Sequence, residues 1–210
     1  MFIPASVMFI MIVSSILQFA PQSVDLAKLT VDESKVHSVN SLIRTSDMII
    51  QGRPTGNPLA KDTGKKIQNK KIINFLQSIH VVSTLKGVHK SSINLLRPGI
   101  SPLPSANDPL NETYPGALAA QDYILFLKKI SGTRYYQVVG TWQGVYPLAP
   151  DGKVISLQEG FAELNGMNAA SVQKLINRTE GYSTKERKRA YVGCQSAHGG
   201  IVDHTKKTGA

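Results

Sequence analysis

The pattern of hydrophobic and polar positions is most regular between Gln121 and Leu157, where short apolar runs alternate with turn residues. The runs are rich in strand-forming residues and are separated by Gly, Pro, Asp and Ser. Four short strands in so few residues predict an antiparallel β meander, whose edges must be covered or closed on themselves. No residue within the meander has the surroundings expected of a catalytic group.

Before the meander, apolar residues recur at steps of three and four from Val36 to Ile43, which predicts a helix over residues 24–45. A short buried strand is expected to follow it and to end at Gly52. The Pro-, Gly- and Lys-rich residues 53–71 predict a loop. The apolar run over 72–87 then predicts one bent strand or two.

Another short strand is expected from Ser92 to Leu96. Five prolines in residues 97–118 predict an extended excursion before the meander. After the meander, Asn168 is suited to cap a helix over residues 169–176.

The first 20 residues carry no charge and are dominated by Ile, Val, Met, Phe and Leu. A helix of this length spans about 30 Å, the hydrocarbon thickness of a bilayer. We therefore expect a signal peptide or an uncleaved membrane anchor. The predicted organisation is a signal peptide or anchor over 1–22, a linker helix over 23–45, a β domain with its helix over 46–177, and a basic, disordered tail over 178–210.

The net charge of +10 over 210 residues is the strongest compositional feature. A basic surface attracts nucleic acid, anionic lipid or anionic cell-wall polymer, and the sign of the charge alone does not choose among them. The single cysteine, Cys194, excludes an intramolecular disulfide.

Six motifs occur in a fixed order between about residues 40 and 160: Ser46–Gly52, Thr84–Gly87, Asp122–Lys128, Tyr135–Gly140, Trp142–Gly144 and Asp151–Val154. In this order they resemble a family of small exported bacterial proteins, mostly uncharacterised. That family is similar in plan to the netrin-like domain of tissue inhibitors of metalloproteinases.

The resemblance implies a mainly β fold: an OB-like antiparallel β-barrel with an N-terminal hydrophobic helix and a C-terminal helix. It also implies an extracytoplasmic location, either secreted or anchored to the membrane through residues 1–20. Netrin-like inhibitors depend on disulfides and on an N-terminal cysteine that chelates the protease metal. This chain has neither, so inhibition does not carry over from the resemblance.

Lysines crowd the predicted loop over 53–71, and OB-folds bind oligonucleotides or oligosaccharides through loops and one strand face. A solvated loop and aromatic rings packed in the core are the simpler interpretation of the same residues. Trp142, between Gly140 and Gly144, is expected to plug one end of the barrel, or alternatively to offer a platform for a sugar or peptide. The candidate binding residues are Lys61, Lys65, Lys66, Lys70, Lys71, Tyr135, Trp142 and Tyr146.

The chain offers little support for an enzyme. It has no G-x-S-x-G nucleophile elbow and no phosphate-binding G-x-x-x-x-G-K loop. Four possible metal ligands lie in the tail, but the surrounding Gly-rich segment has no predicted strand or helix to hold them: Cys194, His198, Asp203 and His204. We expect no catalytic residue, no metal site and no cofactor.

The leading hypothesis is thus a non-enzymatic, exported or membrane-anchored module that binds an anionic wall polymer, lipid head groups or an extracellular protein. The first alternative is a single-stranded nucleic-acid binder with an OB-fold, which would require exposed aromatic rings for base stacking. The second is a protease-inhibitor-like interaction domain.

Overall fold

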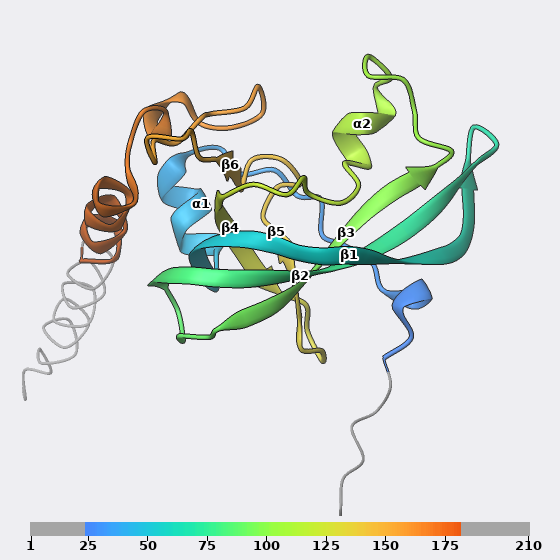
Figure 1. Ribbon diagram of the computed structural model, residues 1–210, viewed down its shortest axis with the longest axis horizontal. Helices are drawn as coiled ribbons and strands as arrows, with labels where there is room; N and C mark the ends of the chain where they lie inside the picture. The colour runs from blue at the N-terminus through green and yellow to red at the C-terminus, as the bar shows by residue number, and fades with distance from the viewer. Residues whose placement is uncertain (1–23, 182–210) are drawn as a thin grey trace, which may run out of the picture.

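The computed structural model describes residues 24–181, and this part of the chain is mainly β, with five strands that close a ring (Figure 1). Hydrogen bonds join the strands in the order β1-β2-β3-β5-β4, and β4 pairs back with β1. A sixth strand, β6, pairs with the edge of β4 that β5 also uses. The strands are β1 (Met48–Ile67), β2 (Lys70–Lys86), β3 (Ser92–Ser101), β4 (Tyr123–Lys129), β5 (Tyr135–Val138) and β6 (Val145–Pro147).

One strand pair differs from the expected all-antiparallel arrangement. β5 runs parallel to β3, with Asn94 opposite Tyr135, whereas the other pairs are antiparallel. The chain leaves β3, passes through α2 (Leu110–Thr113), descends along β4 and returns in β5 beside β3. Strands that alternate in direction bring β3 and β5 into the same orientation, so the ring closes through a parallel pair.

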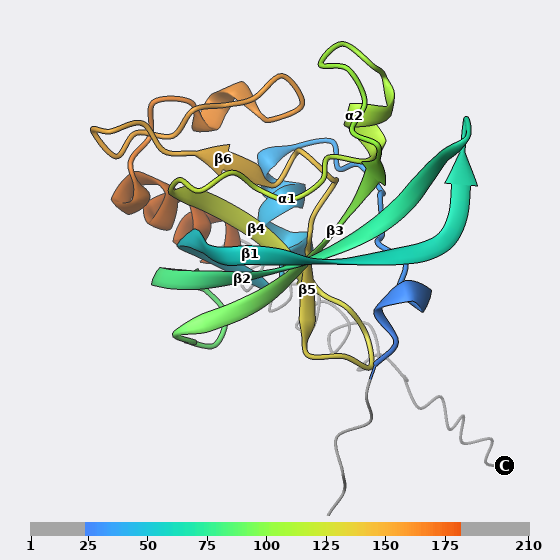
Figure 2. The same cartoon turned by 45° about the vertical axis from the view of Figure 1, so that its right-hand side comes forward.

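The prediction of a loop over residues 53–71 is wrong. β1 and β2 continue as a long hairpin to a two-residue turn at Gln68 and Asn69, whose φ angles are 48° and 63°. Two prolines, Pro54 and Pro58, are tolerated because β4 pairs with β1 only as far as Gly52, so the outer edge of β1 needs no further donors. Figure 2 shows this hairpin extending beyond the ring; we call residues 53–78 the arm.

The prediction of a helix over residues 24–45 is wrong for most of its length. Within this range only α1 (Val39–Thr45) is α-helical. Ser38 is its N-cap, and the Ser38 side chain accepts a hydrogen bond from the Ser41 N–H. Residues 24–38 are extended apart from the short 3₁₀ turn η1 (Leu26–Lys28). We call residues 24–38 the strap.

The strap is extended because side-chain amides of the strands and of the turn before β6 supply the hydrogen bonds that a helix would have made. Three buried residues do this: Asn74 donates to the carbonyls of Leu26 and Leu29, Gln137 accepts from the N–H of Asp32, and Gln143 both donates to and accepts from the backbone of Val36. The backbone groups of Leu26, Leu29, Asp32 and Val36 thus find hydrogen-bond partners on the ring although the strap is extended.

Strand alternation divides the core into two layers. Ile50 and Leu125 belong to the cluster inside the ring, together with residues of β2, β3 and β5. Their neighbours Ile49 and Phe126 face the opposite side, where α1 and the helix over 169–181 cover them. The ring is therefore packed inside and covered on one outer side.

Several expectations are confirmed in modified form. Asn168 caps the C-terminal helix, because its side chain accepts a hydrogen bond from the Ser171 N–H at 2.9 Å. This helix continues to residue 181, past its predicted end and into the segment predicted to be disordered. In the meander, β4, β5 and β6 form, while the fourth predicted strand is reduced to an isolated bridge between Leu148 and Val154.

The signal peptide or anchor predicted over residues 1–22, with its hydrophobic helix, lies outside the described residues. The same holds for the basic tail from residue 182 onward, including Cys194. Within residues 24–181, no helix combines the length and the hydrophobicity that crossing a bilayer requires.

Candidate functional site: the lysine arm and the Trp142 pocket

The five candidate lysines lie together on the arm, but they differ in their partners. Lys71 forms an ion pair with Asp62 at 3.0 Å, and Lys70 forms one with Asp108 at 2.9 Å. Lys61, Lys65 and Lys66 are exposed and form no ion pair among the described residues. The free positive charge of the arm is therefore concentrated in these three side chains.

Asp62 is the only acidic residue within the arm itself, and it remains negatively charged. A hydrogen bond from the Gly64 N–H, together with Lys71 and Lys66, lowers the pKa of its carboxyl. Asp62 thus offsets part of the charge of the arm and leaves an excess of lysines near the turn.

Two of the three candidate aromatic residues are not available to a ligand. Tyr146 is fully buried, and its hydroxyl accepts a hydrogen bond from the Phe161 N–H at 3.0 Å. Burial also raises the pKa of Tyr146 to about 12. Tyr135 is buried in β5, with the guanidinium of Arg134 near its ring. Both tyrosines are therefore buried core residues, and their role in binding stays a prediction.

Trp142 lies on a turn between β5 and β6, where the chain leaves the edge of β4 and rejoins it. Gly140 has a φ of +63°, and a Cβ at Gly144 would lie 2.8 Å from the Phe126 carbonyl oxygen, so both positions require glycine. These two glycines allow the chain to bend sharply at this turn. Gln143, on the same turn, holds the strap through Val36.

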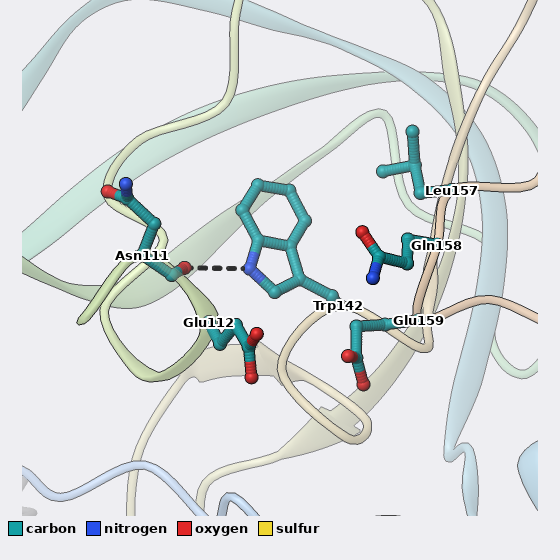
Figure 3. A pocket seen from close by; sticks show the side chains of 6 residues that line it. All are labelled: Asn111, Glu112, Trp142, Leu157, Gln158 and Glu159. Carbon is teal, nitrogen blue, oxygen red and sulfur yellow. Dashed lines mark hydrogen bonds between the residues drawn. The ribbon is translucent and has the colours of Figure 1, made fainter. Parts of the chain in front are cut away.

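The turn presents the Trp142 ring at the wall of a pocket (Figure 3). The indole Nε1–H donates a hydrogen bond to the Asn111 carbonyl at 2.9 Å, which joins the turn to α2. The indole is partly buried against the hydrophobic cluster that fills the inside of the ring of strands. Trp142 thus both packs on the core, as expected, and contributes to a surface hollow.

The pocket has a volume of about 250 Å³. Its walls come from three segments distant in sequence: α2, the turn before β6, and the loop that follows the bridge at Val154. We call it the Trp142 pocket; it is lined by Asn111, Glu112, Trp142, Leu157, Gln158 and Glu159. At its rim, the Lys35 ammonium of the strap lies 2.8 Å from the Glu159 carboxylate.

A buried arginine, which the sequence analysis did not identify, lies next to this pocket. Arg97 is 3% exposed on β3, and its Cζ lies 4.7 Å from the centroid of the Trp142 ring. No group in residues 24–181 accepts a hydrogen bond from its three guanidinium nitrogens. The sequence did carry a signal for its burial: Arg97 lies at the same alternate positions of the strand as Ile93 and Leu95, which face inward.

Two further hollows lie elsewhere on the described part of the chain. One of about 520 Å³ lies beside Arg53 and Asp122, whose side chains already form a two-point ion pair. The other, of about 190 Å³, lies between the strap and the arm.

The described residues contain no group of three or more His, Cys, Asp or Glu side chains placed to hold a metal ion. The predicted tail ligands lie outside residues 24–181. No protein-family model matches the chain, and no curated protein matches it. The geometry of the arm and of the Trp142 pocket is therefore the basis for a functional proposal.

Proposed function

We propose that this chain is a non-enzymatic, exported or membrane-anchored binding module whose arm contacts an anionic partner at the cell surface or wall. The observation that carries the proposal is the group of three exposed lysines, Lys61, Lys65 and Lys66, which have no ion pair within the described residues. Each lysine near an anionic lipid surface contributes about 1 kcal/mol to binding.

The ring of strands supports the finer part of the proposal, an OB-like barrel. OB-folds are five-stranded, partly open barrels that bind ligands on the face of strands 2 and 3 and on the loop between strands 1 and 2. Here the hairpin of β1 and β2 forms the arm, while the strap binds Asn74 on β2. The strap thus covers the arm near Asn74, and the end of the arm around the turn at Gln68 and Asn69 is its more accessible part.

A single-stranded nucleic-acid binder is the weaker alternative. Base stacking requires exposed aromatic rings beside the positive charge. Tyr135 and Tyr146 are buried, and Trp142 lies on the turn before β6 and not on the arm. Protease inhibition has no support beyond the resemblance.

The test compares two charge-reversed variants of the full chain. The arm variant carries Lys61→Glu, Lys65→Glu and Lys66→Glu; the control carries Lys28→Glu, Lys129→Glu and Lys174→Glu and has the same net charge. Binding to phosphatidylglycerol vesicles and to a phosphate-containing wall polymer is measured by sedimentation at two salt concentrations. We expect the arm variant to bind at least hundredfold more weakly, since about 3 kcal/mol is lost, and the control to change far less.

Equal losses in the two variants would show that net charge, and not the arm, is responsible. Tighter binding of the unmodified chain to single-stranded DNA than to either anionic probe would favour the alternative. Protease digestion of intact cells of the native host tests location: the proposal requires a domain that is cleaved from outside.

A further inference from the structure

The Trp142 pocket has the dimensions and lining of a site for one long side chain. Ligand pockets for drug-sized molecules span about 300–1,000 Å³, so a volume of about 250 Å³ is suited to a smaller group. Trp142 and Leu157 provide apolar walls. Asn111, on the opposite wall, is held to Trp142 through its carbonyl oxygen and is therefore fixed in place.

Two carboxylates lie at this pocket, and they come from different segments. Glu159 follows Leu157 in the loop, and Glu112 lies on α2; Figure 3 shows both on the same side of the indole ring. Within residues 24–181, no hydrogen bond or ion pair engages the Glu112 side chain. An apolar pocket with an unpaired carboxylate at its rim is complementary to a cation on an aliphatic stem.

The strap already places such a cation at the rim. The Lys35 ammonium is bonded to Glu159, and the hydrogen bond and charge of Glu159, with a smaller contribution from Glu112, raise the pKa of Lys35. An aliphatic ammonium is thus compatible with the space between the two carboxylates. Lys35 is exposed and reaches the rim from outside, so it leaves the apolar interior unfilled.

Arg97 determines how a ligand would use the indole. Its guanidinium is already stacked on the Trp142 ring. A second cation on the same ring would meet electrostatic repulsion from Arg97, so a head group is better placed on a carboxylate. The hydrocarbon stem, rather than the charge, then packs against Trp142 and Leu157.

We propose that the Trp142 pocket receives a lysine side chain of a partner polypeptide, with its stem against Trp142 and Leu157 and its ammonium on Glu112. The site is separate from the arm, and the proposal does not depend on the proposed function. A saccharide ring stacked on the indole is the competing outcome that the experiment distinguishes.

Trp142 is the only tryptophan of the chain, so its indole N–H gives one assigned signal in a nitrogen–proton NMR spectrum of the full protein. The probe is N-acetyl-lysine-N-methylamide; the matched probes are the norleucine analogue, which lacks the ammonium, and methyl glucoside. We expect the lysine probe to shift the Trp142 signal with a dissociation constant on the order of 1 mM, typical of one small anchor. The norleucine probe should bind several-fold more weakly.

Two variants give effects of opposite sign. Glu112→Gln removes the acceptor and should weaken the lysine probe about two- to fivefold. Lys35→Ala removes the competing ammonium, frees Glu159 and should tighten the same probe about twofold. Glu163→Gln, an exposed glutamate outside the pocket, is the matched control and should leave the affinity unchanged.

Equal binding of the lysine and norleucine probes would overturn the proposal, as would weaker binding in Lys35→Ala. Binding of methyl glucoside in preference to both would replace it with a saccharide site. The arm variant described above should bind the lysine probe as the unmodified chain does, so failure of the arm proposal and failure of the pocket proposal remain distinguishable.

Discussion

The guanidinium of Arg97 lies over the indole ring of Trp142, with 4.7 Å between Cζ and the ring centroid. This contact joins the inside of the ring of strands to the surface pocket, because Trp142 belongs to both. Burial lowers the pKa of Arg97 to about 9, which is still high enough for the side chain to be charged at neutral pH. The fold therefore keeps a positive charge in its interior with a π-system as its main partner.

Replacing Arg97 by methionine is expected to stabilise the protein. A buried charge without hydrogen-bond acceptors is unfavourable, and apolar replacement of buried ionic groups is often neutral or stabilising by about 1–4 kcal/mol. The stacking on Trp142 opposes this gain by about 0.5–2 kcal/mol. We expect Arg97→Met to raise the free energy of unfolding in urea by about 1–2 kcal/mol; a loss of similar size would mean that the contact with Trp142 outweighs the desolvation.

Tyr146 is expected to act through its hydroxyl as part of the core. Tyr146→Phe keeps the ring beside Phe126 but leaves the Phe161 N–H without its acceptor. A buried donor left unsatisfied costs about 1–3 kcal/mol, and the lower end of this range applies to Phe161, which is only half-buried. We expect urea unfolding to show a loss in this range, while binding to anionic vesicles is unchanged. A loss of vesicle binding without a loss of stability would restore Tyr146 as a binding residue.

The strap is expected to make stability depend on pH through Asp32. Hydrogen bonds from Ser34 and Lys128 lower the pKa of the Asp32 carboxyl from 3.8 to about 2. Because the folded-state pKa is the lower one, this contribution is present above pH 3.8 and is lost as the pH falls through about 2. For a side chain that is 41% exposed, solvent screening reduces it to about 1 kcal/mol.

The variant Asp32→Asn should therefore lose about 1 kcal/mol of stability at pH 5 and almost nothing at pH 2, measured by urea unfolding at both values. Glu33→Gln, which removes the same charge at the next position of the strap, is the control. If both variants respond equally to pH, the effect comes from net charge and not from the contacts of Asp32.

The turn of the arm is expected to tolerate a better turn sequence. Gln68 and Asn69 both have positive φ, the geometry of a type I′ turn, in which Asn-Gly is strongly preferred. The double change Gln68→Asn with Asn69→Gly should stabilise the protein by about 0.5–1 kcal/mol in urea unfolding. A destabilised double variant would mean that the side chains of Gln68 and Asn69 stabilise the turn more than the Asn-Gly preference does.

The pattern of the sequence was sufficient for elements that carry their own local signal. The strand at Met48, the strands at Tyr123 and Tyr135, and the Asn168 cap were all predicted, because alternation and capping are local properties of the chain. Trp142 was also singled out from its flanking glycines. The other residues of the Trp142 pocket were not, since α2 and the loop at Leu157 meet Trp142 only in three dimensions.

Where prediction failed, tertiary contacts outweighed local preference. Residues 24–38 were predicted to be part of a helix, yet hydrogen bonds to Asn74, Gln137 and Gln143 hold them extended. Residues 53–71 have the composition of a loop, yet pairing with β2 makes them a strand whose free edge accepts prolines.

The sequence by itself thus determined the class of structure, the strong positive charge and the positions at which several elements begin, because these depend on neighbours along the chain. Only the tertiary structure decided that Arg97 is buried against Trp142, that Tyr146 is core, and that Glu112 and Glu159 share one pocket. Burial and the meeting of distant side chains are properties of packing, and free energies of packing depend on which segments the closed ring brings together.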